Sequence, residues 1–132
     1  MSLKFINPTS LGTPSGFSNG VLTEPGSRIL FIAGQIASDE QQKIISTDFV
    51  VQFERALAKV IAVVTEAGGR PEQIVRLTIY VVDKTEYARR TREVGDRYRA
   101  LMGKHFPAMA LIEVKGLLDD SAKVEIEGVA AL

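Results

Sequence analysis

The chain has 132 residues, of which 45% are hydrophobic and 24% are charged, with no cysteine, no tryptophan and one histidine, His105. This length fits one domain spanning residues 1–132, and the composition is that of a folded protein rather than a disordered one. The 16 basic and 16 acidic residues give a formal net charge of zero, which makes nucleic acid an unlikely partner. The missing cysteines exclude disulfides and cysteine-based zinc sites, and one histidine excludes a His-rich metal site. We therefore predict neither a metal nor another cofactor.

No stretch approaches the roughly 18 consecutive apolar residues of a membrane span. The first residues also lack the apolar core of a secretory signal. We therefore expect a cytoplasmic protein without membrane contact. A net charge of zero further favours self-association, because electrostatic repulsion between copies is weak.

The first third of the chain combines loops with short extended segments. Residues 7–20 are rich in Gly, Pro and Asn and indicate a loop, with a brief strand over Phe17–Leu22. Residues 24–27 have the Pro-Gly centre of a type II turn. The apolar run 28–33 should then pair back on the first strand as a hairpin, and residues 38–43 form a second turn.

From Asp48 the apolar residues recur every three or four positions, which predicts a helix capped by Thr47 or Asp48 and ended by Gly68-Gly69. Residues 74–82 then alternate as a strand. The side of this strand predicted to meet the helix carries Val75, Leu77, Ile79 and Val81.

A second helix is predicted over residues 85–102, and Gly95 in its middle indicates close packing. Strands follow at 109–114 and 123–130. The inner stripe of this helix is expected to contain Tyr87, Thr91, Val94, Tyr98 and Leu101. The fold class is α+β: a mostly antiparallel sheet with two helices packed on one face.

The other face of this sheet has mixed character. It should carry Thr78, Tyr80, Glu125, Glu127 and the side chains around Gln35. This set is too polar for a core and too apolar for a solvated face. We therefore predict that subunits pack these faces together and leave polar clefts between them.

Glu127 is the leading candidate for chemistry, because a partly buried carboxylate can act as a general acid or base. An interface ion pair with an arginine is the alternative. His105, before Phe106-Pro107, is more simply a packing or surface residue. The arginines of the second helix are most simply a solvated face, with RNA contact as the lesser reading. No nucleotide-binding glycine motif and no nucleophile elbow is present.

Several segments resemble the RidA/YjgF family of imine and enamine deaminases, also known as endoribonuclease L-PSP proteins. They are Phe17-Ser18-Asn19-Gly20, Ala33-Gly34-Gln35-Ile36, Glu66-Ala67-Gly68-Gly69, the strand 74–83, Pro107–Val114 and Val124–Ala130. Their order and spacing cover nearly the whole chain.

The resemblance implies a chorismate-mutase-like fold and a homotrimer with a central barrel. Three clefts between neighbouring subunits would bind a small molecule. In the deaminases an arginine grips the substrate carboxylate, a tyrosine, a serine and a glutamate complete the site, and water replaces ammonia at the imine carbon.

This sequence keeps the glutamate as Glu127 but has Met109, Phe17 and Ala33 where the family has arginine, tyrosine and serine. Since methionine cannot pair with a carboxylate, we expect a substrate other than 2-imino acids. Gly34, Gln35 and Thr91 complete the predicted binding residues. The alternative is a non-catalytic binding or regulatory trimer, and a ribonuclease or translation inhibitor ranks last because no histidine pair or metal cluster is available.

Overall fold

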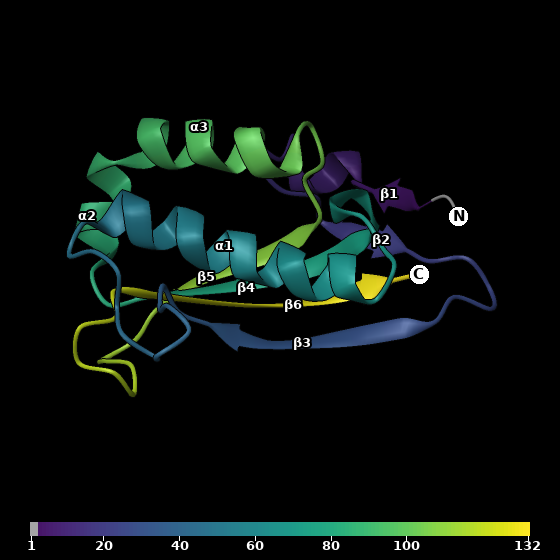
Figure 1. Ribbon diagram of the computed structural model, residues 1–132. Helices are drawn as coiled ribbons and strands as arrows, with labels where there is room; N and C mark the ends of the chain where they lie inside the picture. Colours follow the sequence, from purple (N-terminus) through teal and green to yellow (C-terminus); the bar gives the residue numbers. More distant parts are fainter. Residues whose placement is uncertain (1–2) are drawn as a thin grey trace.

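The computed structural model describes residues 3–132, and a four-stranded sheet in the order β3-β6-β4-β5 forms its base (Figure 1). The strands are β3 (Ile29–Gln35), β4 (Ile74–Val81), β5 (Ala108–Glu113) and β6 (Val124–Ala131). β6 pairs antiparallel with both neighbours, whereas β4 and β5 are parallel. The prediction of an α+β fold with a mixed, mostly antiparallel sheet is confirmed.

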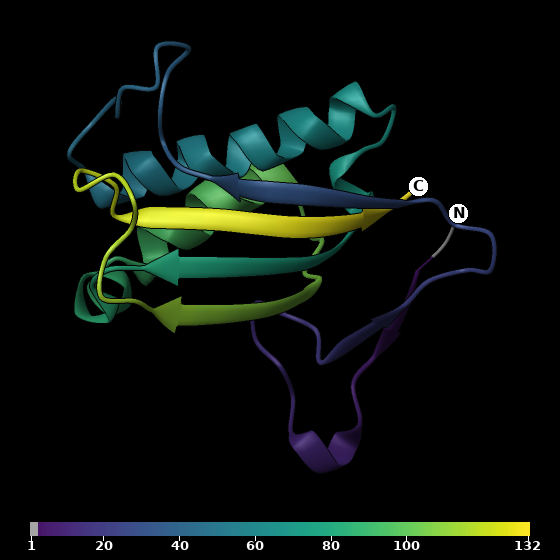
Figure 2. The same cartoon turned by 90° about the horizontal axis from the view of Figure 1, so that it is seen from below.

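Helices cover only one face of this sheet. α1 (Phe49–Glu66) and α3 (Thr91–Met102) lie above it in Figure 1, and α2 (Lys84–Arg89) lies at one end. Figure 2 shows the opposite face with no element in front of the four strands. We call this uncovered surface the open face. Short 3-10 turns occur at Thr9–Leu11 and Pro71–Gln73.

The core lies between α1 and the sheet. Asp48 caps α1 by accepting a hydrogen bond from the Val51 amide at 3.0 Å, as predicted. Phe53, Leu57 and Val60 on the inner side of the helix are at most 1% exposed. The 3.6-residue period of these apolar side chains therefore predicted the helix correctly.

The predicted alternation in β4 is wrong at its start. Ile74 is fully buried in the core, and Val75 is only half-buried. Ile74 pairs with Ala130 and Arg76 with Val129, so one extra residue of β4 is accommodated in a β-bulge. Bulges shift the alternation by one residue. From Leu77 onward the predicted faces are correct.

The predicted hairpin between residues 17–22 and 28–33 is also wrong. β2 (Gly20–Leu22) pairs instead with β1 (Lys4–Ile6), and β3 pairs with β6. Residues 24–27 do form a tight turn, with a positive φ of 83° at Gly26. That turn sends the chain into a different sheet, so the N-terminal segment forms an arm beyond the β5 edge (Figure 2).

The predicted second helix is two helices with a break at Arg90, whose φ and ψ of −112° and 16° are not helical. The Arg90 guanidinium holds Glu93 at 2.8 Å and Asp48 at 3.2 Å. These contacts tie the break to the start of α1. Thr91 begins α3 and is exposed rather than on the inner stripe.

Gln52 is a fully buried polar residue that connects two loops. Its side chain donates to the carbonyls of Ser46 and Ser121 at 2.8 and 3.0 Å and accepts from the Lys123 amide at 2.8 Å. The buried amide of Gln52 thus has partners for both its nitrogen and its oxygen. The loops before α1 and before β6 are therefore fixed to one side chain.

Candidate functional site

The open face carries the predicted catalytic carboxylate. Glu127 lies on β6 opposite Thr78 of β4, and Glu125 lies opposite Tyr80. All four side chains point away from the helices, because residues paired across strands share a face. Partial burial, followed by the charge of Glu127 and a hydrogen bond with it, raises the pKa of the Tyr80 phenol. Tyr80 is therefore a protonated donor beside Glu127 at neutral pH.

β3 approaches this region through a bulge between Ile32 and Gln35. A Cβ atom on Gly34 would lie 2.5 Å from Oε2 of Glu125, closer than real contacts allow. Glycine at this position lets the carboxylate lie against the backbone of β3. The Gln35 side chain is turned back on its own strand and donates to the Ala33 carbonyl at 3.0 Å.

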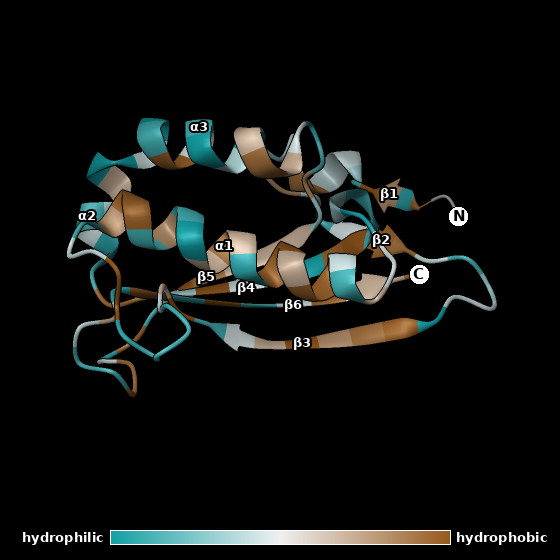
Figure 3. Ribbon diagram, viewed as in Figure 1, coloured by the Kyte–Doolittle hydropathy of each residue, from teal (hydrophilic) through white to brown (hydrophobic). Residues whose placement is uncertain are grey.

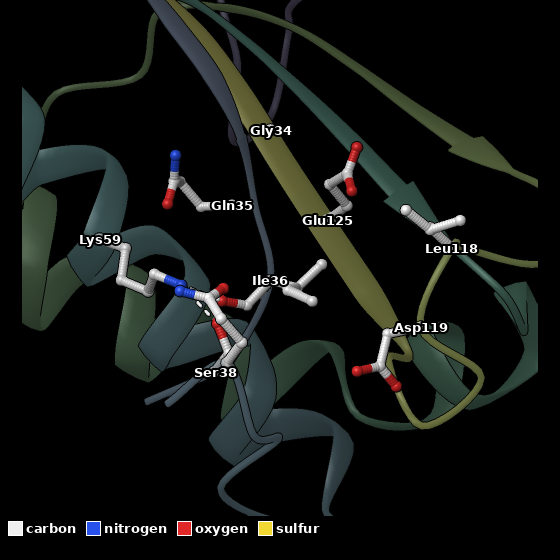
Figure 4. Close-up of a pocket in the computed structure, with 9 residues that line it drawn as sticks. Gly34, Gln35, Ile36, Ser38, Lys59, Leu118, Asp119 and Glu125 are labelled. Atoms are coloured by element: carbon white, nitrogen blue, oxygen red, sulfur yellow. Dashed lines mark hydrogen bonds between the residues drawn. The ribbon is translucent and has the colours of Figure 1, made fainter. Parts of the chain in front are cut away.

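A first cavity of about 490 Å³ opens where β3 ends (Figure 4). Gly34, Gln35 and Glu125 line it. Lys59 of α1 extends to the residues that follow β3, where its ammonium donates to the Ile36 carbonyl at 2.9 Å and to Ser38 Oγ at 2.8 Å. Burial lowers the pKa of Lys59, and the charge of Arg55 adds to this effect. Lys59 therefore acts mainly as a clamp on the backbone of β3.

A second cavity, of about 330 Å³, lies on the helix-covered side of the sheet. It contains two predicted binding residues, Thr91 of α3 and Met109 of β5. Its wall is completed by Ser15, Gly16, Phe53, Ile79, Tyr87, Val94, Gly95, Tyr98, Arg99 and Phe106. Apolar side chains supply most of this surface, and among residues 3–132 Arg99 is the only charged residue that lines it.

The N-terminal arm reaches the second cavity because Ser18 anchors it. The buried Ser18 donates from its amide to the Pro107 carbonyl at 3.0 Å and from its hydroxyl to the Phe106 carbonyl at 2.7 Å. Ser15 and Gly16 are thereby held at the cavity wall. Phe17 lines neither cavity and is 39% exposed.

One chain does not bring the predicted site residues together. Met109 pairs with Leu77 and faces the helices, whereas Glu127 pairs with Thr78 and faces the opposite way. Ala33 is exposed on β3. The predicted residues therefore fall into two groups on opposite sides of one sheet, and a shared site would need two copies of the chain.

Sequence reasoning missed several residues that line these cavities. Lys59 gave no signal, because a lysine inside an amphipathic helix is ordinarily a solvated residue. Tyr87 was assigned to the core. Arg99 was assigned to a solvated face, although its spacing of four from Gly95 places the two side by side on one helix surface.

His105 is a packing residue, one of the two readings that the sequence left open. Its ring is buried, and Nε2 donates to the Ile74 carbonyl at 2.6 Å. Phe5 of β1 packs edge-on against the ring at 5.8 Å between centroids. His105 thus joins the N-terminal arm to the core. Within residues 3–132, no helix is long and apolar enough to cross a bilayer, and no three His, Cys, Asp or Glu side chains are grouped to hold a metal ion.

Comparison with known proteins gives matches over most of the chain. The family model described as Endoribonuclease L-PSP matches residues 9–132. The 2-iminobutanoate/2-iminopropanoate deaminase of Salmonella typhimurium is 33% identical over 108 residues, which are 80% of each chain. The chain belongs to the RidA/YjgF family. The resemblance predicted from the sequence is therefore confirmed.

Solved RidA/YjgF structures share the fold. A Rid-family protein of unknown function from Yersinia pestis, YyfB, superposes with a TM-score of 0.87 at 30% identity, and each chain is covered completely. Escherichia coli TdcF, solved with bound serine, gives a TM-score of 0.69 at 26% identity and covers 92% of this chain and 91% of its own. The arrangement described above is thus that of the RidA/YjgF family.

Proposed function

We propose that the protein hydrolyses a small imine or enamine at clefts between the subunits of a cytoplasmic homotrimer. Water adds to the carbon of the C=N bond, the C–N bond breaks, ammonia leaves and a carbonyl product remains. The observation that carries the proposal is the position of Glu127, half-buried on the open face beside the protonated Tyr80. A carboxylate in this setting can position the water and move its proton.

The open face supports assembly with further copies of the chain. Phe31 is 78% exposed, Ile29 is 48% exposed and Ile112 is 42% exposed, and Figure 3 shows the apolar character of β3. Surfaces of this kind are ordinarily covered by another protein surface. A site that combines Met109 with Glu127 would then take these residues from two copies of the chain.

The substrate is proposed to be a larger imine than 2-iminobutanoate and 2-iminopropanoate, the two 2-imino acids named for the Salmonella typhimurium relative. The expectation of a substrate other than 2-imino acids is thereby narrowed to these two short ones. Met109 stands where the sequence resemblance places the carboxylate-binding arginine, and its side chain lies in an apolar cavity. The serine bound to TdcF shows that a RidA/YjgF structure can hold a small amino acid. In this chain the cavity around Met109 favours a larger apolar body.

The test is ammonia and keto-acid release from imines generated in situ by an amino-acid oxidase. 2-Iminopropanoate and imino acids with longer apolar side chains are compared with and without the protein. We expect acceleration for the longer substrates and a loss of about 10²–10⁴-fold in Glu127→Gln. Glu125→Gln removes the same charge two residues away and should retain most of the activity.

Equal rates for wild type and Glu127→Gln would contradict the role of Glu127. No acceleration of any imine would favour the non-catalytic binding trimer, for which the apolar residues Phe17, Ala33 and Met109 are the supporting observation. Light scattering or analytical ultracentrifugation of the same samples tests the homotrimer independently of turnover.

A further inference from the structure

The second cavity contains one charge in an otherwise uncharged wall. Arg99 lies on α3 one turn after Gly95, and a Cβ atom on Gly95 would be 3.2 Å from Nη1 of Arg99. The guanidinium therefore folds back across the glycine, although the side chain remains 55% exposed. Glycine inside a helix is unfavourable relative to alanine, and here it makes room for the guanidinium at the cavity wall.

The guanidinium is held in this position from one side only. Nη2 of Arg99 donates to Asp96 at 2.8 Å, in a pair whose side chains are more than half exposed. Nη1 is the atom that lies over Gly95, and none of the described residues that line the cavity is acidic. Nη1 is thus positioned to donate to a ligand at the cavity mouth. Because an exposed ion pair is weak, Asp96 orients the guanidinium without blocking a ligand.

Two tyrosines, Tyr87 and Tyr98, line the same cavity. The Tyr87 ring is fixed edge-on against Phe49, with 6.3 Å between centroids. Burial raises the pKa of Tyr87, so that its hydroxyl stays protonated. The Tyr98 hydroxyl, in contrast, is committed to the His105 carbonyl at 2.6 Å. The remaining wall, including Met109, Phe53 and Phe106, is apolar.

We propose that this cavity binds an apolar carboxylate, with the anionic group at Arg99 and Tyr87 and the hydrocarbon body against Met109. This proposal names the substrate class of the proposed function and rests on it. Met109 of β5 cannot bind an anion, but the guanidinium of Arg99 on α3 can, because arginine pairs with carboxylates through parallel hydrogen bonds. With the charge on α3, the Met109 side of the cavity is left to the hydrocarbon body.

The experiment compares two isosteric probes, 3-phenylpropanoate and 3-phenylpropanamide, by calorimetry and by NMR shifts of the full chain. We expect the carboxylate to bind at least tenfold more tightly than the amide. Arg99→Met should remove this preference and leave amide affinity unchanged. Arg97→Met is the matched control, because Arg97 lies on the same helix, is similarly exposed and pairs with Glu54 outside the cavity.

Gly95→Ala provides a second variant that separates binding from stability. The added methyl group should displace the Arg99 guanidinium and weaken 3-phenylpropanoate several-fold, while the melting temperature rises because alanine favours the helix. Equal affinity of wild type for both probes, no binding of either, or loss of preference in Arg97→Met would overturn the proposal. Because binding is measured without turnover, carboxylate binding without imine hydrolysis would contradict the proposed function alone.

Discussion

The two faces of the sheet differ in what completes them. The face under α1 and α3 is closed by residues of the same chain, and Leu57, Leu77 and Ile126 on it are fully buried. The open face alternates carboxylates and a phenol with exposed apolar side chains such as Phe31. One chain is thus sufficient for the core but leaves the open face unfinished. The buried core and the carboxylate of Glu127 are separated by the thickness of one sheet.

The largest expected difference between the faces is in stability. Leu57→Ala should lower the free energy of unfolding by about 2–5 kcal/mol, because it leaves a cavity in a closed core. Phe31→Ala should cost the isolated chain less than about 1 kcal/mol and weaken self-association instead. Urea unfolding at several protein concentrations distinguishes the two. A loss in Phe31→Ala that matches Leu57→Ala at the lowest concentration would break the comparison.

A smaller effect on stability is expected at the start of α1, the helix that covers the closed face. Asp48→Ala removes the cap of α1 and the partner of Arg90, and should cost about 1 kcal/mol. The hydrogen bond from the Val51 amide, assisted by Arg90, lowers the pKa of Asp48. Because the pKa of Asp48 is lower in the folded state, its carboxylate stabilises the fold at pH values above its unfolded-state pKa of about 3.9. This stabilisation is lost as the pH falls through the pKa of the folded state.

Asp48→Asn is the control for this prediction, since asparagine also caps helices but does not titrate. Near neutral pH the free energy of unfolding of Asp48→Asn should differ from that of wild type only by the contribution of the ion pair with Arg90. Between about pH 5 and 2 its stability should fall less steeply than that of wild type. Parallel curves for the two proteins in acid would show that Asp48 carries no pH dependence.

The smallest effect is confined to the open face. Glu127→Gln should lower the pKa of Tyr80 toward its ordinary value, because the charge next to the phenol is removed. Absorbance titration of tyrosinate between pH 9 and 12 follows this change, and Tyr80→Phe identifies the transition. Tyr87 and Tyr98, which owe their raised pKa values to burial on the other side, should titrate as before.

Sequence patterns predicted the closed face better than the open one. The alternation in β6 and the helical period of α1 are both direct consequences of burying one side, and both predictions were confirmed. β1 was missed, because three residues, Lys4–Ile6, are too few to show a period. The break at Arg90 was missed because it comes from ion pairs with Asp48 and Glu93 rather than from glycine or proline.

The candidate site was predicted only in part. Glu127 was singled out from the alternation of the last strand and again through the resemblance, whereas Met109 and Gly34 were found through the resemblance alone. The resemblance did not indicate that Met109 and Glu127 lie on opposite sides of the sheet. β3 pairs with β6, almost 100 positions later in the chain. The prediction that β3 forms a hairpin with the preceding strand assumed that strands adjacent in sequence pair with each other, and was therefore wrong. Gly95 and Arg99 are four positions apart in the sequence. Only the structure shows that both line the second cavity, which is why the sequence did not predict a role for them.

The bulge at the start of β4 has a consequence for how this chain tolerates change. Ile74 and Val75 are both branched aliphatic residues, and only one of them fills the core at a time. Loss of one residue from the turn at Pro71–Gln73 would pull the other residue into the same space. The start of β4 can therefore shift its register by one residue and still fill the core with a branched aliphatic side chain. Length variation ahead of β4 would then leave Thr78, Tyr80 and the face they serve in place.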